Sequence, residues 1–397
     1  MKRVLVVGLA RSGLAAKAAL EANRVKVVAA DLKLGNDTDL RLLDGVDVLV
    51  KSPGVPGEAP LVVAARERGI PVWSEVELAS RFLENPIVGV TGTNGKTTTT
   101  ELLGEMLPAP TAGNVGTALS ELHDASVPGP GSPIVCELSS FQLEDIDTFK
   151  PHIAVLLNLE PDHLDRHGTF EAYRDAKLRI FENQTSEDVA IVPRGFGLIP
   201  GSARRVEFSA DDELPAEPLI PGRHNRENAA AATAAARAFG QDDDAIAHVL
   251  RTFPGVPHRL ELVAEIGGVR FVNDSKATNT AAARRALTAY EAPLHVILGG
   301  SLKGERFDEF AADVARANVV MAYLIGEAAE PLATDLGYAS VPFVVATTLE
   351  RAVADAASSA QRGEIVLLSP ACASYDQFRD FEHRGEELKR LVQNLKE

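Results

Sequence analysis

The chain has 397 residues, of which 45% are hydrophobic and 24% charged, and its formal net charge is −16 at pH 7. One hydrophobic core rarely serves more than about 250–300 residues, so this length excludes a single small module and predicts two to three domains. The negative charge disfavours nucleic acid and an anionic membrane surface as partners, although a local positive pocket can still bind a small phosphorylated ligand.

Short apolar runs alternate along the chain with stretches rich in alanine, leucine and arginine that are typical of helices. Near-continuous Val, Ile and Leu within a run indicates a parallel strand that is buried on both faces. We therefore predict the α/β class. The expected strands are 4–7, 25–29, 46–50, 87–90, 134–138, 153–157, 189–192, 269–272, 294–298, 319–325, 343–345 and 365–368.

Two places along the chain predict domain boundaries. Around residues 73–77 a strand-like run ends and a helix begins. At residues 253–257 two prolines and a glycine follow an alanine-rich helix, and strands restart at Leu260. The sequence thus predicts three domains: 1–74, 75–256 and 257–397.

The first strand is followed by a glycine-rich turn, Gly8-Leu-Ala-Arg-Ser-Gly13, and Asp31 ends the second strand. This is the place of a ribose-binding carboxylate in a dinucleotide site, but Ala10 replaces the middle glycine of that fingerprint. The pattern leaves open a ligand site or a tight packing turn. The start of the chain fits a strand and turn better than a signal peptide, because Arg11 interrupts its apolar stretch.

The strongest local signal is Val90-Thr-Gly-Thr-Asn-Gly-Lys-Thr-Thr98, between an expected strand and an expected helix. Backbone N–H groups of such a loop can bind phosphate, while Lys96 reaches the outer phosphates and Thr97 contacts Mg²⁺. Val90 occupies the place of the first glycine in the strict phosphate-loop motif, so a plain glycine-rich turn remains the alternative. The strand and helix context favours nucleotide phosphate.

Three further side chains of the middle region could act on the same nucleotide: Glu137, His163 and Lys177. Glu137 and His163 follow expected strands, and the carboxyl ends of parallel strands converge on the crevice where ligands bind. They could face a Mg²⁺-nucleotide together with Lys96. Taken singly, each has a structural alternative: a helix-capping carboxylate, a surface histidine and a solvated lysine.

In the last third, polar segments follow three expected strands, at 272–279, 298–303 and 369–378. Small and polar residues at strand ends are typical of α/β binding sites. Lys276 and Lys303 lie in these segments, where an ammonium group could neutralise phosphate or carboxylate. The two cysteines, Cys136 and Cys372, lack metal or redox spacing, which predicts reduced thiols in the cytoplasm. No apolar run is long enough to span a membrane.

Read together, these segments resemble the Mur ligases over essentially the whole chain. NDSKATN and SPACASYDQF point to the members that add D-glutamate, whereas the phosphate loop with the later Glu and His is shared with folylpolyglutamate synthase. The segments that carry the resemblance, in order, are GVTGTNGKTTTT, ELSSFQLE, NLEPDHLDRHG, AKLRIFEN, GRHNRENAAAA, PHRLE, NDSKATN, LGGSLKG and SPACASYDQF.

The resemblance implies a monomeric, cytoplasmic enzyme of peptidoglycan precursor synthesis. It implies a Rossmann-like N-terminal domain for a UDP-sugar, a central P-loop ATPase-like parallel sheet, and a Rossmann-like C-terminal domain that brings the amino acid. The reaction would join D-glutamate to UDP-N-acetylmuramoyl-L-alanine. ATP would phosphorylate the substrate carboxylate to an acyl phosphate, which the amine of D-glutamate then attacks.

The resemblance also implies roles for individual residues. Lys96, Glu137, His163 and Lys177 would be catalytic, with one Mg²⁺ near Thr97 and Glu137, a second near His163, and Lys177 carbamylated as a metal ligand. ATP would bind Gly92, Thr93, Asn94, Gly95, Lys96, Thr97, Thr98, Asn228, Arg259 and Asp274. The UDP-substrate would bind Arg11, Ser12, Asp31, Gly54 and Asn114, and D-glutamate would bind Lys276, Thr278, Lys303, Ser374 and Phe381.

Three alternatives to this ligase remain at the level of sequence. A nicotinamide dehydrogenase built on the first glycine turn would leave Lys96 and the later motifs without a role. A non-catalytic nucleotide switch would bind ATP without forming an amide bond. Within the superfamily, glutamate chain extension on a folate is the remaining reading.

Overall fold

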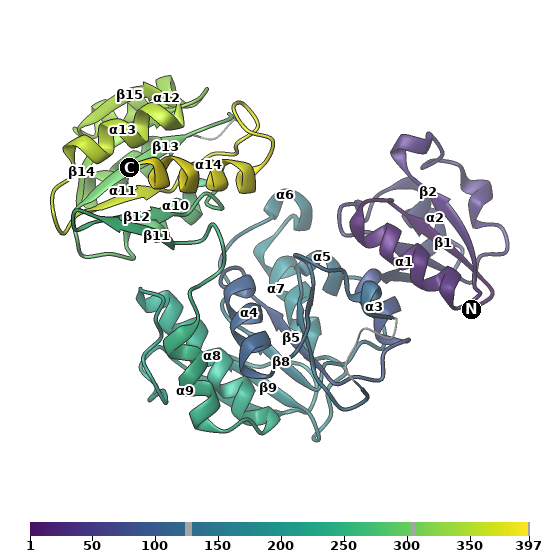
Figure 1. The fold of residues 1–397 in the computed structure, drawn as a ribbon. Helices are drawn as coiled ribbons and strands as arrows, with labels where there is room; N and C mark the ends of the chain where they lie inside the picture. Colours follow the sequence, from purple (N-terminus) through teal and green to yellow (C-terminus); the bar gives the residue numbers. More distant parts are fainter. Residues whose placement is uncertain (124–128, 303–305, 396–397) are drawn as a thin grey trace. The chain divides into compact units, whose positions relative to one another are not determined.

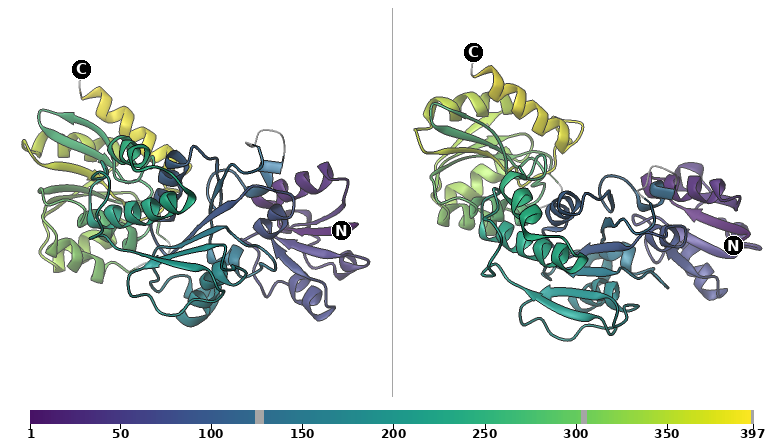
Figure 2. Two further views of the ribbon diagram at one scale, coloured as in Figure 1. Left: turned by 90° about the horizontal axis from the view of Figure 1, so that it is seen from below. Right: turned by 60° about the horizontal axis from the view of Figure 1, so that its bottom comes forward.

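The computed structural model describes residues 1–123, 129–302 and 306–395. The fold is α/β, as predicted, with three separate sheets (Figure 1). Contacts between residues group the chain into two compact units. The first unit comprises residues 1–218 and 224–252 and contains two of the sheets, and the second comprises 219–223 and 253–397 and contains the third. Figure 2 shows the same sheets from two further directions.

The N-terminal sheet has four parallel strands in the order β2-β1-β3-β4. Successive residues of β1 point to opposite faces: Val4 and Val6 pack into a core with α1 residues, and Leu5 and Val7 into a core with α2 residues. Burial on both faces explains the uninterrupted apolar run. The elements are β1 (Arg3–Val7), α1 (Arg11–Ala22), β2 (Lys26–Ala30), 3-10 helices η1 (Leu32–Leu34) and η2 (Leu40–Leu43), β3 (Val48–Lys51), α2 (Pro60–Glu67) and β4 (Val72–Ser74).

The central sheet has six parallel strands in the order β10-β9-β8-β5-β7-β6. The sequence did not predict β6 (Thr111–Gly113), which has three residues, or β10 (Arg204–Phe208), an edge strand whose charged residues are exposed. The other strands are β5 (Ile87–Thr91), β7 (Ile134–Glu137), β8 (Ile153–Leu156) and β9 (Val189–Pro193). The helices are α3 (Glu75–Ser80), α4 (Lys96–Met106), η3 (Leu119–His123), α5 (Ser140–Leu143), α6 (Leu164–His167), α7 (Phe170–Leu178), η4 (Arg179–Phe181), α8 (Arg223–Phe239) and α9 (Asp243–Thr252).

The third sheet has the order β11-β12-β16-β13-β14-β15. The predicted strands of this sheet pair in parallel, and β11, which was not among them, runs antiparallel to β12 because a tight turn at Gly267 and Gly268 joins the two. The strands are β11 (Glu261–Ile266), β12 (Val269–Asn273), β13 (Leu294–Gly299), β14 (Val319–Ile325), β15 (Phe343–Thr347) and β16 (Ile365–Leu368). The helices are α10 (Thr280–Leu287), α11 (Asp308–Arg316), α12 (Ala329–Tyr338), α13 (Leu349–Ser359) and α14 (Phe381–Asn394).

The strand orders determine where polar side chains meet. In the central sheet β5 lies between β7 and β8, so the segments that follow these three strands start at one edge. In the third sheet β16 lies between β12 and β13, which brings the three polar segments of the last third to one edge as well. Within the described part of the chain, no helix is long and apolar enough to cross a membrane.

Candidate active site

The phosphate-loop segment connects β5 to α4, and its backbone needs glycine. Gly95 caps the helix with φ +82°, and a Cβ atom there would lie 2.2 Å from Oδ1 of Asn228 on α8. The loop is fixed by Asn158 after β8, whose backbone O accepts from the N–H of Thr93 (3.0 Å) and whose Oδ1 accepts from the N–H of Asn94 (2.9 Å). The N-terminus of α4 is thus held as a rigid end that favours an anion.

Two lysines converge on this loop. Lys96 Nζ donates to the backbone O of Gly92 and of Thr93, both at 2.9 Å, and Lys177 Nζ donates to the same Gly92 O at 2.8 Å. Lys177 is only 2% exposed. Burial, and secondarily the charge of Lys96, lowers the pKa of the Lys177 amine well below its ordinary value. A larger fraction of this amine is therefore neutral than in an ordinary surface lysine.

Glu137 ends β7 beside the loop and is 2% exposed. Its Oε1 accepts from Nδ2 of Asn114 at 2.9 Å, whereas its Oε2 is buried and has no hydrogen-bond partner among the described residues. A buried carboxylate oxygen without a hydrogen bond lowers the stability of the fold unless a cation binds it. With the Thr97 hydroxyl in the first turn of α4, Glu137 provides the oxygen ligands that Mg²⁺ prefers.

His163 is more exposed than these groups and lies in a strained backbone position. It precedes α6 with φ +51°, and its side chain is 48% exposed. Its ring lies 4.9 Å from that of Phe141 and 6.3 Å from that of Tyr173, whose hydroxyl is 3.0 Å from Oγ1 of Thr93. The described residues contain no group of three His, Cys, Asp or Glu side chains already arranged around a metal.

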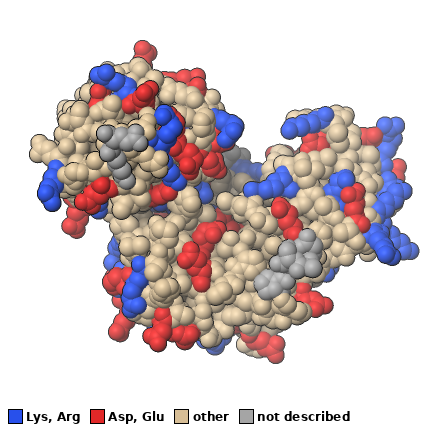
Figure 3. Space-filling model, viewed as in Figure 1, with Lys and Arg blue, Asp and Glu red and all other residues tan. Residues whose placement is uncertain are grey.

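Of the residues expected to bind a uridine nucleotide, four follow strands of the N-terminal sheet (Arg11, Ser12, Asp31 and Gly54), and Asn114 follows β6 of the central sheet. Arg11 Nη2 donates to the backbone O of Asn114 at 3.3 Å. Both carboxylate oxygens of Asp31 accept backbone N–H groups, from Leu9 and from Lys33, and these bonds lower the pKa of Asp31. Ser12 is in the first turn of α1. In the view of Figure 3, Lys and Arg gather along the right-hand edge of the N-terminal part of the chain, despite the net charge of −16.

In the second unit, the expected residues lie on loops that follow neighbouring strands. Asp274 follows β12; its Oδ2 accepts from Oγ of Ser369 at 2.7 Å, and burial raises the pKa of its carboxyl to about 7. Lys276 Nζ lies 5.7 Å from the centre of the Phe381 ring. Ser374 is buried in the loop after β16. Lys303 lies outside the described residues, and Thr278 and Arg259 are half-buried near Asp274 in the chain.

A residue that sequence reasoning missed holds these loops together. Arg384 on α14 is 0% exposed. Its guanidinium donates to the backbone O and Oγ of Ser275 (2.9 and 3.0 Å), to the O of Cys372 (3.1 Å) and to the O of Ala373 (3.2 Å). No local pattern distinguishes this arginine from those on an exposed helix face.

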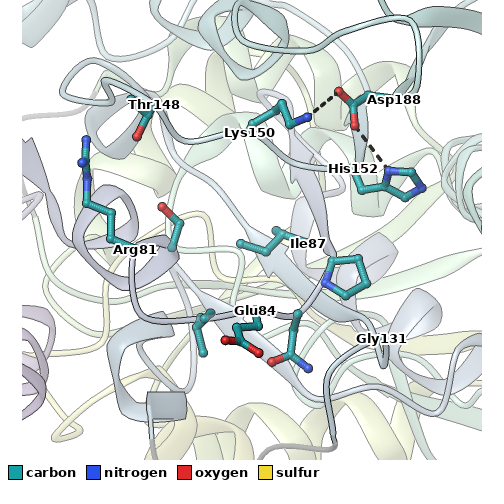
Figure 4. A pocket seen from close by; sticks show the side chains of 12 residues that line it. Arg81, Glu84, Ile87, Gly131, Thr148, Lys150, His152 and Asp188 are labelled. Atoms are coloured by element: carbon teal, nitrogen blue, oxygen red, sulfur yellow. Dashed lines mark hydrogen bonds and ion pairs between the residues drawn. The ribbon is translucent and has the colours of Figure 1, made fainter.

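A pocket of about 400 Å³ lies at the opposite end of the central sheet, where β5 begins at Ile87. Figure 4 shows that three of its side chains face one another: Asp188 pairs with Lys150 at 3.2 Å and with His152 at 3.3 Å. Arg81, which also lines it, pairs with Glu77. Because Asp188, Lys150 and Arg81 are paired within the protein, the carboxyl edge of the sheet is the better candidate.

Comparisons with known proteins agree with this geometry. Two family models match, the Mur ligase middle domain over residues 90–196 and the Mur ligase, glutamate ligase domain over residues 258–372. A protein of Acidobacterium capsulatum named UDP-N-acetylmuramoylalanine–D-glutamate ligase is 41% identical, over 98% of this chain and 96% of its own length.

Solved structures of related proteins share the fold. A UDP-N-acetylmuramate–alanine ligase from Thermotoga maritima has a TM-score of 0.60 at 21% identity, over 100% of both chains. The MurF ligase of Thermotoga maritima in complex with ADP also has a TM-score of 0.60, at 18% identity over 91% of this chain and 92% of that one. At these identities the similarity concerns the fold alone.

Proposed function

The chain belongs to the Mur ligase family, and we propose that it joins D-glutamate to UDP-N-acetylmuramoyl-L-alanine while ATP is converted to ADP and phosphate. The observation that carries this proposal is the 41% identity to a D-glutamate ligase over almost the full length of both chains. The phosphate loop, with Lys96 and the buried Glu137 beside it, gives the proposal a physical basis.

The first chemical step brings two anions together. An oxygen of the substrate carboxylate forms a bond to the γ-phosphorus of ATP, and the bond from that phosphorus to the bridging oxygen of ADP breaks. Lys96 and the N-terminus of α4 would neutralise charge that develops on the phosphoryl oxygens. The product of this step is an acyl phosphate and ADP.

The second step forms the amide. The neutral amine of D-glutamate attacks the acyl carbon, the amine loses a proton, and the carbon–oxygen bond to phosphate breaks. The phosphate therefore leaves with an oxygen that came from the substrate carboxylate. An acyl phosphate hydrolyses readily, so a site that excludes water would favour the amide product.

We propose that the site binds two Mg²⁺ ions and contains a modified lysine. Oε2 of Glu137 and the Thr97 hydroxyl would hold one ion, and His163 the second. Bound Mg²⁺ supplies positive charge that polarises the transferred phosphoryl group. We propose that the neutral Lys177 amine adds CO₂, losing a proton, to become a carbamate that offers oxygen ligands; the lowered pKa of this amine supports the proposal.

The second unit would bind the amino acid and contribute part of the nucleotide site. We retain as a proposal the division into three domains, at 1–74, 75–256 and 257–397. Arg259 and Asp274, with Asn228 of the first unit, would contact ATP. Lys276, Thr278, Lys303, Ser374 and Phe381 would contact D-glutamate. The support for this assignment is that the loops after β12 and β16 are tied by Arg384 in one arrangement.

A phosphate-release assay with a panel of acceptors tests the proposal. With ATP, Mg²⁺ and UDP-N-acetylmuramoyl-L-alanine, we expect release with D-glutamate and none above background with L-glutamate or other D-amino acids. Mass spectrometry should then find the UDP-muramoyl dipeptide. Release with a folate and L-glutamate instead, or release that needs no acceptor, would contradict the proposal.

A further inference from the structure

The loop after β3, residues 53–57, is held by three cationic side chains from three different elements. Arg166 on α6 donates from Nη1 to the backbone O of Pro53 (3.1 Å) and from Nη2 to that of Val55 (2.8 Å). Lys51, at the end of β3, donates to the same Val55 O at 3.3 Å, and Arg66 on α2 donates to the O of Gly57 at 3.1 Å. These bonds surround Gly54, where the uridine nucleotide is expected.

The same cations bind two carboxylates that follow α5. Glu144 Oε1 lies 2.9 Å from Lys51 Nζ and 3.1 Å from Arg166 Nη2. Asp145 lies 2.8 Å from both Lys51 Nζ and Arg66 Nη2. The side chains of Lys51 and Asp145 are 0% and 3% exposed, so water screens this network little. We call Lys51, Arg66, Glu144, Asp145 and Arg166 the clasp.

The clasp also contacts the turn that carries His163. The Arg166 guanidinium lies over the ring of Phe141, 4.4 Å from its centre. The Phe141 ring lies 4.9 Å from that of His163 and is stacked on that of His167 at 5.4 Å. Arg166 is therefore joined to loop 53–57 by hydrogen bonds and to the His163 turn by ring contacts and by its place on α6.

We propose that Arg166 is a positioning residue that couples loop 53–57 to the His163 turn, so that the UDP-substrate and the nucleotide strengthen each other's binding. The inference rests on the proposed function and on the expected sites, which are Gly54 for the UDP-substrate and His163 for a Mg²⁺ ion of the nucleotide. A guanidinium suits this role because its planar donors can bind two carbonyls and a carboxylate at once, which an ammonium cannot do in the same geometry. Coupling of this kind is reciprocal.

Calorimetric titration tests the coupling without turnover. UDP-N-acetylmuramoyl-L-alanine is titrated into the full chain with and without Mg²⁺ and a non-hydrolysable ATP analogue. In the unsubstituted protein we expect the analogue to tighten binding by at least about fivefold. In Arg166→Met we expect the UDP-substrate to bind about tenfold more weakly and the analogue to change its affinity by less than about twofold.

Arg81→Met is the matched control. Arg81 is also an arginine of the first unit, with a side chain that is 29% exposed against 15% for Arg166; it pairs with Glu77 and Asp147, and its guanidinium lies over the ring of Trp73 at 3.8 Å. We expect this control to keep both the affinity and the coupling. Arg166→Lys, which retains the charge beside Glu144, should give intermediate coupling, and it replaces the methionine variant if that variant does not fold.

The outcomes separate this inference from the proposed function. If the unsubstituted protein does not bind the UDP-substrate, the proposed function fails. If it binds but shows no coupling, or if Arg166→Met retains the coupling, the inference is overturned while the function remains. If Arg166→Met and Arg81→Met lost affinity and coupling equally, Arg166 would have a merely structural role, and the inference would again be overturned.

Discussion

Each of the two units buries a cation beneath the polar loops of its expected site, Lys177 in the first and Arg384 in the second, and these two cations behave differently. Lys177 in the first unit is 2% exposed and lies close to a second cation, Lys96, so the pKa of its amine is strongly lowered. Arg384 in the second unit is 0% exposed, yet burial lowers the pKa of its guanidinium only to about 10. At neutral pH the arginine stays charged, whereas the lysine is driven toward the neutral form.

The difference follows from the two functional groups. A guanidinium spreads its charge and has a fixed fork of donors, which Arg384 uses to bind three loop carbonyls and a hydroxyl. An ammonium is a compact charge that burial removes readily, and the neutral amine that results is a nucleophile. Under the proposed function Lys177 is buried for chemistry, whereas Arg384 is buried to hold the loops of the second unit.

The largest expected effect is on catalysis at Lys177. We expect Lys177→Met to lower kcat on the order of a thousandfold, because the carbamate ligand proposed for the phosphoryl-transfer site could not form. Its thermal stability should be equal or higher, because the buried amine is a cost to the fold. Phosphate release and calorimetric melting measure the two effects. If Lys177→Met kept a tenth of the normal kcat, the chemical role proposed for Lys177 would be contradicted.

For Arg384 the expected effect is on stability. Arg384→Met removes four hydrogen bonds to buried atoms of Ser275, Cys372 and Ala373, so we expect the second unit to lose about 3 kcal/mol of stability. Hydrogen exchange of amides in β12 and β16 reports this unit separately from the first. The matched control is Arg390→Met, an exposed arginine of the same helix that pairs with Glu387. Unchanged exchange in Arg384→Met would contradict the architectural role.

The buried carboxyl of Asp274 should make the stability of the second unit depend on pH. Burial raises the pKa of this carboxyl to about 7, above its ordinary value of 3.8. The neutral acid is therefore the form that folding favours, and its contribution is complete below about pH 4 and is lost as pH rises through 7. We expect the second unit to be about 2 kcal/mol less stable at pH 8 than at pH 5. Hydrogen exchange at the two pH values measures this, and Asp274→Asn should remove the difference.

The smallest effect concerns Glu75, a buried acid in the first unit. Its Oε1 accepts from the N–H of Ser120 at 2.5 Å, its Oε2 has no hydrogen-bond partner in the described part of the chain, and burial raises its pKa to about 7. At pH 8 the charged form is a cost, so we expect Glu75→Gln to stabilise this unit by about 1 kcal/mol. At pH 5 the gain should vanish. A gain that is equal at both pH values would contradict the assignment.

Local pattern was enough to predict most of the fold and the phosphate loop. Buried parallel strands such as β5 and β16 are continuous apolar runs, and the glycines before Lys96 stand where strand meets helix. The edge strand β10 was not predicted because its residues are largely charged and exposed. The antiparallel direction of β11 was not predicted because it depends on the turn to β12. The roles of Arg166 and Arg384 could not be predicted, because the residues that they contact are distant in sequence and are brought together only by folding.

The transfer of oxygen from substrate to phosphate is the most direct test of the chemistry proposed for the phosphate loop. UDP-N-acetylmuramoyl-L-alanine labelled with ¹⁸O in its carboxylate is incubated with ATP, Mg²⁺, D-glutamate and the full chain, and the released phosphate is analysed by mass spectrometry. We predict one ¹⁸O atom in each phosphate and one in the new amide. Unlabelled phosphate would mean that water, and not the carboxylate, attacks ATP, and would contradict the acyl-phosphate route.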